Sequence, residues 1–184
     1  MQREQKRMRW DAVLSRFNGD DKIIGCEVGV WRGKMSEALL QRHKNLFLIM
    51  VDRFAPPVKG DSYHTSGSEM ALCDQKKYDA VFDECLQKVA MWAGRIKIIK
   101  MSTVEAADHV ENGTLDFCFI DADHSYEGVK ADITAWLPKV KKGCWICGHD
   151  WKNTKKGNVE KAVREFFTDK QIQVDANSTW FVKL

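Results

Sequence analysis

Residues 22–33 of the chain read KIIGCEVGVWRG, an apolar run that leads into a turn with glycines at positions 29 and 33. A helical pattern follows this turn. Glycine allows the backbone to approach a ligand closely, and the first turn of a helix presents free N–H groups. A strand, a glycine turn and a helix in this order therefore predict a binding loop for a nucleotide-like molecule.

Two common loops of this kind do not match the sequence. A phosphate-binding P-loop needs a glycine five residues before Gly33, where Val28 stands, and Ser or Thr after the lysine, where Met35 stands. A dinucleotide-binding loop needs the spacing Gly-x-Gly-x-x-Gly, which Gly29 and Gly33 do not have, and this disfavours a nucleotide-dependent oxidoreductase. The carboxylate of Glu27 would repel a pyrophosphate but attract the cationic amino-acid end of S-adenosylmethionine.

Apolar runs rich in branched residues alternate with helical patterns along the chain. The expected strands are Lys22–Val28, Leu46–Val51, Ile96–Met101, Leu115–Ile120, Cys144–Cys147, Gln171–Val174 and Thr179–Val182. Near-continuous apolar runs suit a parallel sheet that is covered on both faces. The order indicates an α/β fold with helices on both faces of the sheet and a C-terminal antiparallel hairpin.

The length fits one domain, and we expect a single domain over residues 1–184 that begins with a helix over residues 1–17. Helical periodicity is clear over residues 126–137, where Pro138 ends it, and over residues 159–167. Basic residues gather near the start of the chain. We interpret them as a solvated helix face, with a surface for an anionic partner as the alternative; they are Arg3, Lys6, Arg7 and Arg9.

The segment Arg53–Lys77 departs from the alternating pattern. It contains Pro56-Pro57 and a glycine-containing polar stretch, and it shows no helical periodicity. Long irregular loops in compact domains are often lids over a binding site, so we expect this segment to form a lid.

Composition excludes several classes of partner. The net charge of +3 is too mild for a typical nucleic-acid-binding domain, and we expect no nucleic-acid partner. No apolar run reaches the length of about 20 residues that crosses a membrane. The six cysteines are scattered, and Cys144 and Cys147 would face opposite sides of a strand, which indicates core positions. A charged N-terminus and unpaired cysteines predict a cytoplasmic protein.

Residues 115–132 read LDFCFIDADHSYEGVKAD and resemble the fourth-strand region of a family of small class I S-adenosylmethionine-dependent methyltransferases. In that family, which is methyltransferase-24-like and related to catechol-type and sugar O-methyltransferases, Ile-Asp-x-Asp-His-x-Tyr runs into a helix. The run Gly148-His149-Asp150 and the helix over 159–167 are similar as well, and the likeness extends from about Cys26 to Phe167. It implies a Rossmann-like seven-stranded methyltransferase sheet and S-adenosylmethionine as the cofactor.

The glycine loop and the strand ends supply candidate cofactor ligands. Asp52 ends the second expected strand, where an acid can accept both ribose hydroxyls. The resemblance implies that Met101 and Ser102 flank the adenine. The predicted cofactor-binding residues are Glu27, Gly29, Val30, Gly33, Asp52, Arg53, Met101, Ser102 and Asp121.

A second group of polar residues follows the fourth and fifth strands, and parallel strand ends meet at one edge of the sheet. The related O-methyltransferases hold magnesium with acids here, and the likeness to them implies a metal site of Asp121, His149 and Asp150 for Mg or Mn. The histidine departs from their pattern, because histidine is a poorer ligand for magnesium and a better one for manganese, iron or zinc. The alternative is a general base, Asp123, His124 or His149, because an imidazole titrates near neutral pH.

These patterns predict methyl transfer from S-adenosylmethionine to a small-molecule acceptor, with oxygen as the favoured acceptor atom. The rival hypothesis is a non-catalytic module that binds S-adenosylmethionine and keeps only the fold. The sequence leaves the acceptor and the oligomeric state open, a homodimer included.

Overall fold

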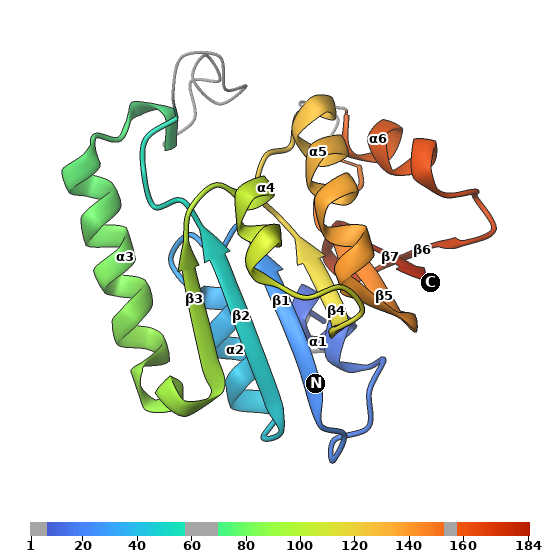
Figure 1. Ribbon diagram of the computed structural model, residues 1–184, viewed down its shortest axis with the longest axis horizontal. Coiled ribbons are helices and arrows are strands. Elements are labelled where there is room, and N and C mark those ends of the chain that lie inside the picture. The colour runs from blue at the N-terminus through green and yellow to red at the C-terminus, as the bar shows by residue number, and fades with distance from the viewer. Residues whose placement is uncertain (1–6, 58–69, 153–157) are drawn as a thin grey trace, which may run out of the picture.

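The computed structural model describes residues 7–57, 70–152 and 158–184 (Figure 1). Its strands form one seven-stranded sheet in the order β3-β2-β1-β4-β5-β7-β6. The first five strands pair in parallel, whereas β7 is antiparallel to both β5 and β6. The strands are β1 (Ile23–Val28), β2 (Leu46–Asp52), β3 (Ile96–Lys100), β4 (Leu115–Ile120), β5 (Val140–Gly148), β6 (Ile172–Asp175) and β7 (Thr179–Lys183). This confirms the Rossmann-like sheet with its C-terminal antiparallel hairpin.

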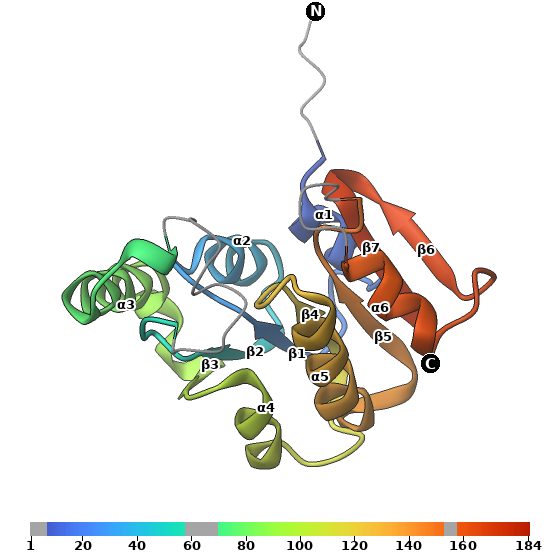
Figure 2. The same ribbon diagram turned by 90° about the horizontal axis from the view of Figure 1, so that it is seen from above.

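Helices cover both faces of the sheet, as Figure 2 shows. They are α1 (Arg9–Leu14), α2 (Lys34–Arg42), α3 (Gln75–Val89), α4 (Thr103–Ala106), α5 (Tyr126–Trp136) and α6 (Val159–Phe166). Buried side chains of α1, α2 and α3 pack on one face, and those of α4, α5 and α6 pack on the other. None of the helices in the described ranges is both long and apolar enough to span a membrane.

The central strands are buried on both faces, which explains their near-continuous apolar runs. In β4, Phe117 and Phe119 point into the cluster beneath α1–α3, while Cys118 and Ile120 point into the cluster beneath α4–α6. The pair in β5 follows the same rule: Cys147 packs in the first cluster and the partly buried Cys144 lies against the second. The interpretation of these cysteines as core residues is therefore confirmed.

Element boundaries differ from the prediction by more than one residue in the N-terminal helix, the expected lid and the fifth strand. The N-terminal helix covers only Arg9–Leu14, and residues 1–6 of its expected range lie outside the described residues. Residues 58–69 of the expected lid lie outside them too. Its last three residues are helical, because the carboxylate of Asp74 accepts the Lys77 N–H at 2.9 Å and starts α3 at Gln75. The fifth strand begins at Val140, four residues before its expected start.

Candidate functional site

A cavity of about 260 Å³ opens at the carboxyl edge of the parallel strands. Gly29, Asp52, Arg53, Ser102 and Asp121 line it, so five of the nine predicted cofactor residues meet there. They lie at the ends of β1, β2, β3 and β4 or within two residues after them, as the parallel topology requires. The other four predicted residues are not among the described residues that line it: Glu27, Val30, Gly33 and Met101.

The glycine turn is fixed by a close approach of two strand tips. Gly29 has a φ of +94°, and a Cβ at this position would lie 2.4 Å from the carbonyl oxygen of Asp121. The Asp121 N–H also donates to the Val28 carbonyl at 2.8 Å. Gly33 has a φ of +71° and precedes α2, where a Cβ would meet the sulfur of Cys85 at 2.8 Å. Both glycines are therefore required by the backbone itself, and not only by a ligand.

The carboxylate of Asp52 ties the glycine turn to the end of β2. It accepts the Trp31 N–H and the Phe54 N–H, each at 2.8 Å. Both donor residues have left-handed backbones, with φ of +52° and +47°, and such strain persists only where contacts hold it. Burial raises the pKa of Asp52, although the N–H groups of Phe54, Trp31 and Val30 favour its charged form. A carboxylate has about four acceptor positions, so acceptor capacity remains for a ribose hydroxyl.

Glu27 lies near the end of β1 and is buried. The Ser36 hydroxyl of α2 donates to its carboxyl at 2.5 Å. Burial raises the pKa of Glu27 to about 8, despite this hydrogen bond and the nearby charge of Arg9. Without a cationic ligand, the side chain is therefore mainly uncharged at pH 7.

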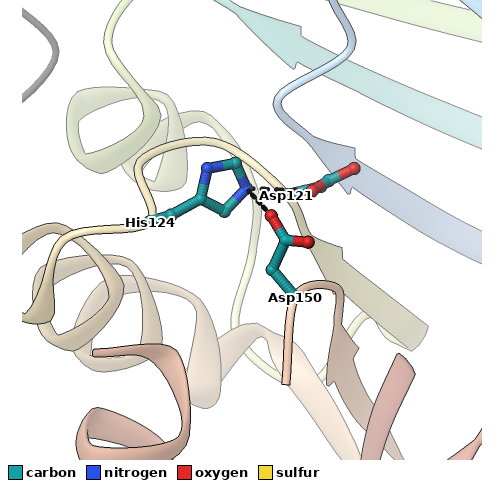
Figure 3. A group of neighbouring side chains, drawn as sticks. All are labelled: Asp121, His124 and Asp150. Atoms are coloured by element: carbon teal, nitrogen blue, oxygen red, sulfur yellow. Dashed lines mark hydrogen bonds and ion pairs between the residues drawn. The ribbon is translucent and has the colours of Figure 1, made fainter. Parts of the chain in front are cut away.

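Figure 3 shows the polar cluster where β4 and β5 end. His124 Nε2 lies 3.2 Å from Asp121 Oδ1 and 3.1 Å from Asp150 Oδ2. His149 Nδ1 lies 3.5 Å and 3.2 Å from the same two carboxylates. The structure thus brings the three predicted metal ligands together and adds His124, which was predicted as a base. The ligand atoms of Asp121, His124 and Asp150 all lie within 4.8 Å of one another.

Asp123, the third candidate base, sits at the start of α5. Its carboxylate accepts the Ser125 N–H at 2.8 Å, and the Ser125 hydroxyl accepts the Gly128 N–H at 3.0 Å. These contacts begin the helix. Asp123 also lines the cavity. The structure therefore gives it a clear capping contact and a position beside the ligand.

Asp121 joins the cavity to the cluster and carries a paired charge. Arg9 Nη1 lies 2.6 Å from its Oδ2. Burial alone would raise the pKa of Asp121, but hydrogen bonds with His124 and His149 and the charge of Arg9 lower it to about 2. The interpretation of the N-terminal basic run as a solvated face is wrong for Arg9, whose side chain is only 24% exposed and ends at a strand tip of the site.

The cavity lining also contains residues that no sequence pattern singled out, among them Tyr78, Thr103, Val104 and Asp132. Asp132 is 2% exposed; its Oδ1 accepts the Thr103 hydroxyl, while its Oδ2 has no hydrogen-bond partner among the described residues. Burial raises its pKa to about 7. A signal was available, because Asp132 follows Val129 by three residues on the apolar face of the predicted helix, where a charged residue is rarely placed.

Comparisons with known proteins agree with this geometry. A family model described as a methyltransferase domain matches residues 26–151. The uncharacterized protein y4gI of Sinorhizobium fredii is 32% identical over 54 residues, which cover 29% of this chain and only 6% of that protein.

Two solved structures share the fold at low sequence identity. The O-methyltransferase NovP has a TM-score of 0.63 at 18% identity, over 88% of this chain and 71% of its own. The calicheamicin methyltransferase CalS11 has a TM-score of 0.67 at 15% identity, over 95% of this chain and 76% of its own.

Proposed function

Because the chain belongs to the family of class I S-adenosylmethionine-dependent methyltransferase domains, we propose that it transfers a methyl group from this cofactor to a hydroxyl oxygen of a small molecule. One observation carries the proposal. The cavity that Gly29 and Asp52 line is continuous, through Asp121, with a cluster of carboxylates and imidazoles. A cofactor site and a group of proton acceptors therefore meet at one side chain. NovP, which shares the fold, is an O-methyltransferase, and this supports oxygen as the acceptor atom.

Each end of the cofactor has a matching part of the cavity. The Gly29 turn would pass beneath the methionine group, and the Asp52 carboxylate would accept the ribose hydroxyls. Ser102, after β3, would flank the adenine, beside Thr103 and the buried Asp132. Trp31 also lines the cavity and supplies an apolar wall.

Methyl transfer is an in-line displacement at a sulfonium, so the protein must hold the two reactants in line and remove a proton from the acceptor. The cluster beyond Asp121 is suited to the second task. His124 is held between Asp121 and Asp150, and the two contacts orient its ring. An acceptor hydroxyl that reaches His124 would therefore lose its proton to an imidazole already oriented by two carboxylates.

The same side chains fit a divalent metal ion. Two carboxylates with one or two imidazoles form a mixed oxygen and nitrogen donor set, which suits manganese better than magnesium. Asp121 pairs with Arg9 through Oδ2 and turns Oδ1 toward His124, so one oxygen faces the group. We propose that Asp121, His124 and Asp150, with His149 beside them, hold such an ion. A bound ion would act as a Lewis acid that favours the ionised form of the acceptor hydroxyl.

Replacing Asp52 with asparagine is expected to weaken binding of S-adenosylhomocysteine at least tenfold. The amide has one acceptor oxygen instead of two, and a lost hydrogen bond to a charged group costs about 1.5–3 kcal/mol. Titration calorimetry measures the affinity. The control is Asp20→Asn, because Asp20 is an acid exposed to solvent. Equal affinity of both variants and the wild-type protein would contradict the assignment of Asp52.

Removal of metal with EDTA is expected to abolish turnover, and Mn²⁺ is expected to restore it. Asp150→Asn should weaken Mn²⁺ binding at least roughly tenfold, because even the loss of a group that only hydrogen-bonds to a metal ligand has an effect of that size. Elemental analysis and calorimetry with Mn²⁺ measure this, with exposed Asp108→Asn as the control. Turnover that is indifferent to EDTA in metal-free protein would assign deprotonation to His124 as a general base.

The same measurements address the rival hypothesis of a binding module. A protein that binds S-adenosylhomocysteine through Asp52 but methylates none of a panel of phenolic and sugar hydroxyls, with or without Mn²⁺, would favour the non-catalytic module. Turnover of any member of the panel would exclude it.

A further inference from the structure

The methionine end of S-adenosylmethionine is a zwitterion, so it needs a cationic partner for its α-carboxylate as well as acidic partners for its ammonium group. Glu27 and Asp121 are acids and match the ammonium group. Beside them, the α-carboxylate would be repelled unless a cation stands close by. This inference rests on the proposed function, because it concerns how the same cofactor is held.

Arg9 supplies a cation at this point. It is the first residue of α1, yet its guanidinium reaches Asp121 at the tip of β4, 112 residues away in sequence. The charge of Arg9 lowers the pKa of Glu27 as well as that of Asp121. The guanidinium therefore acts on both acids, one at the tip of β1 and one at the tip of the neighbouring strand β4.

The guanidinium has donors to spare. Nη1 is used by Asp121, and among the described residues Nε and Nη2 of Arg9 form no hydrogen bond or ion pair. A guanidinium carries five N–H groups in a planar fork that matches the two oxygens of a carboxylate. A partly buried guanidinium that uses one N–H group for Asp121 and has further donors without a partner is suited to bind a second carboxylate.

The helix that carries Arg9 is firmly docked, so the guanidinium is held in place. Trp10, Ala12 and Val13 are buried in the core cluster of α1–α3. On the other side, Arg7 and Arg16 both pair with Asp175, at 2.7 and 2.8 Å, near the hairpin of β6 and β7. A preorganised side chain loses little conformational entropy when a ligand arrives.

We propose that Arg9 binds the α-carboxylate of the methionine group of the cofactor, while Glu27 and Asp121 receive its ammonium group. The N-terminal helix is then part of the cofactor site. The ion pair between Arg9 and Asp121 holds the guanidinium in position before the ligand binds, and the ligand completes an alternating set of charges.

The test compares two probes that differ in the amino-acid group. S-adenosylhomocysteine has the methionine-type end, whereas 5′-methylthioadenosine lacks it. In calorimetry, Arg9→Gln is expected to bind S-adenosylhomocysteine at least tenfold more weakly than the wild-type protein and to bind 5′-methylthioadenosine within twofold of it. Arg9→Lys keeps the charge but not the planar fork, so its affinity for S-adenosylhomocysteine should lie between those of the wild-type protein and Arg9→Gln. The matched control is Arg7→Gln, which removes a neighbouring arginine that holds α1 through Asp175.

Each other outcome overturns the proposal. Equal losses for both probes in Arg9→Gln and Arg9→Lys would mean that Arg9 only supports the fold. Unchanged affinity for S-adenosylhomocysteine would place the carboxylate elsewhere, and an increased affinity would mean that Arg9 blocks the site. Wild-type protein that binds neither probe would overturn the proposed function, and with it the inference.

Discussion

Replacing Gly29 with alanine is expected to lower the free energy of unfolding by about 2–5 kcal/mol and to abolish binding of S-adenosylhomocysteine. A left-handed backbone costs a residue with a Cβ about 1–2 kcal/mol, and overpacking costs about 1–3 kcal/mol more. The new Cβ would lie 2.4 Å from the Asp121 carbonyl oxygen and 2.7 Å from the Ala122 Cα. These are backbone atoms, so the tips of β1 and β4 must separate, and the cavity between them must change shape.

Gly113 provides a matched control for this substitution. It also has a left-handed backbone, with a φ of +65°, but no heavy atom lies within 4 Å of a Cβ built there. Gly113→Ala should therefore cost only about 1–2 kcal/mol and leave binding unchanged. Urea unfolding and calorimetry measure both effects. If the two variants behave alike, the close approach of β1 and β4 is not what requires Gly29.

A strand that is buried on both faces can be located from its amino-acid composition. Strands β1, β2 and β4 were located within one residue because they are apolar on both faces, so burial leaves a continuous run. The fifth strand was shortened because Lys141, Lys142 and Gly143 at its start read as a polar turn, yet Val140 pairs with Leu115 of β4. Such pairing is made by backbone groups, which leave no mark on side-chain composition.

In the site, too, some contacts could be predicted from the sequence and others could not. That the ends of β4 and β5 meet follows from the parallel topology, so the group of Asp121, His149 and Asp150 could be predicted. The addition of His124 depends on how the turns bend the chain, including a left-handed φ of +59° at Asp150. The ion pair between Arg9 and Asp121 spans 112 residues and has no periodic signal. A basic residue near a terminus looks solvated until the fold shows its partner.

Glu27 leads to a second large effect, in which stability and binding change in opposite directions. Burial raises its pKa from an ordinary 4.5 to about 8. Between these two values the folded protein keeps a proton that the unfolded chain releases. The free energy of unfolding therefore falls as the pH rises through this window, by on the order of 3 kcal/mol from pH 5 to pH 8 for this group. Asp132, whose pKa is raised to about 7, adds to the same trend.

Replacing Glu27 with glutamine should remove this dependence, because an amide of the same shape does not titrate. At pH 5 the variant and the wild-type protein should be similarly stable, whereas at pH 8 the variant should be more stable by on the order of 3 kcal/mol. Urea unfolding at pH 5, 6, 7 and 8 measures the difference. Glu111→Gln is the control, because Glu111 is exposed, and it should follow the wild-type curve.

The same variant should bind S-adenosylhomocysteine at least tenfold more weakly, because the ammonium group loses a charged partner worth about 1.5–3 kcal/mol. Since Glu27 is mainly protonated at pH 7 without ligand, binding to the wild-type protein should release a proton that binding to Glu27→Gln does not. Calorimetry in two buffers of different ionisation enthalpy detects that proton. If Glu27 has only a structural role, the substitution should stabilise the protein and leave binding unchanged. If the substitution stabilises the protein but weakens binding and abolishes proton release, Glu27 is an acid that contacts the ligand.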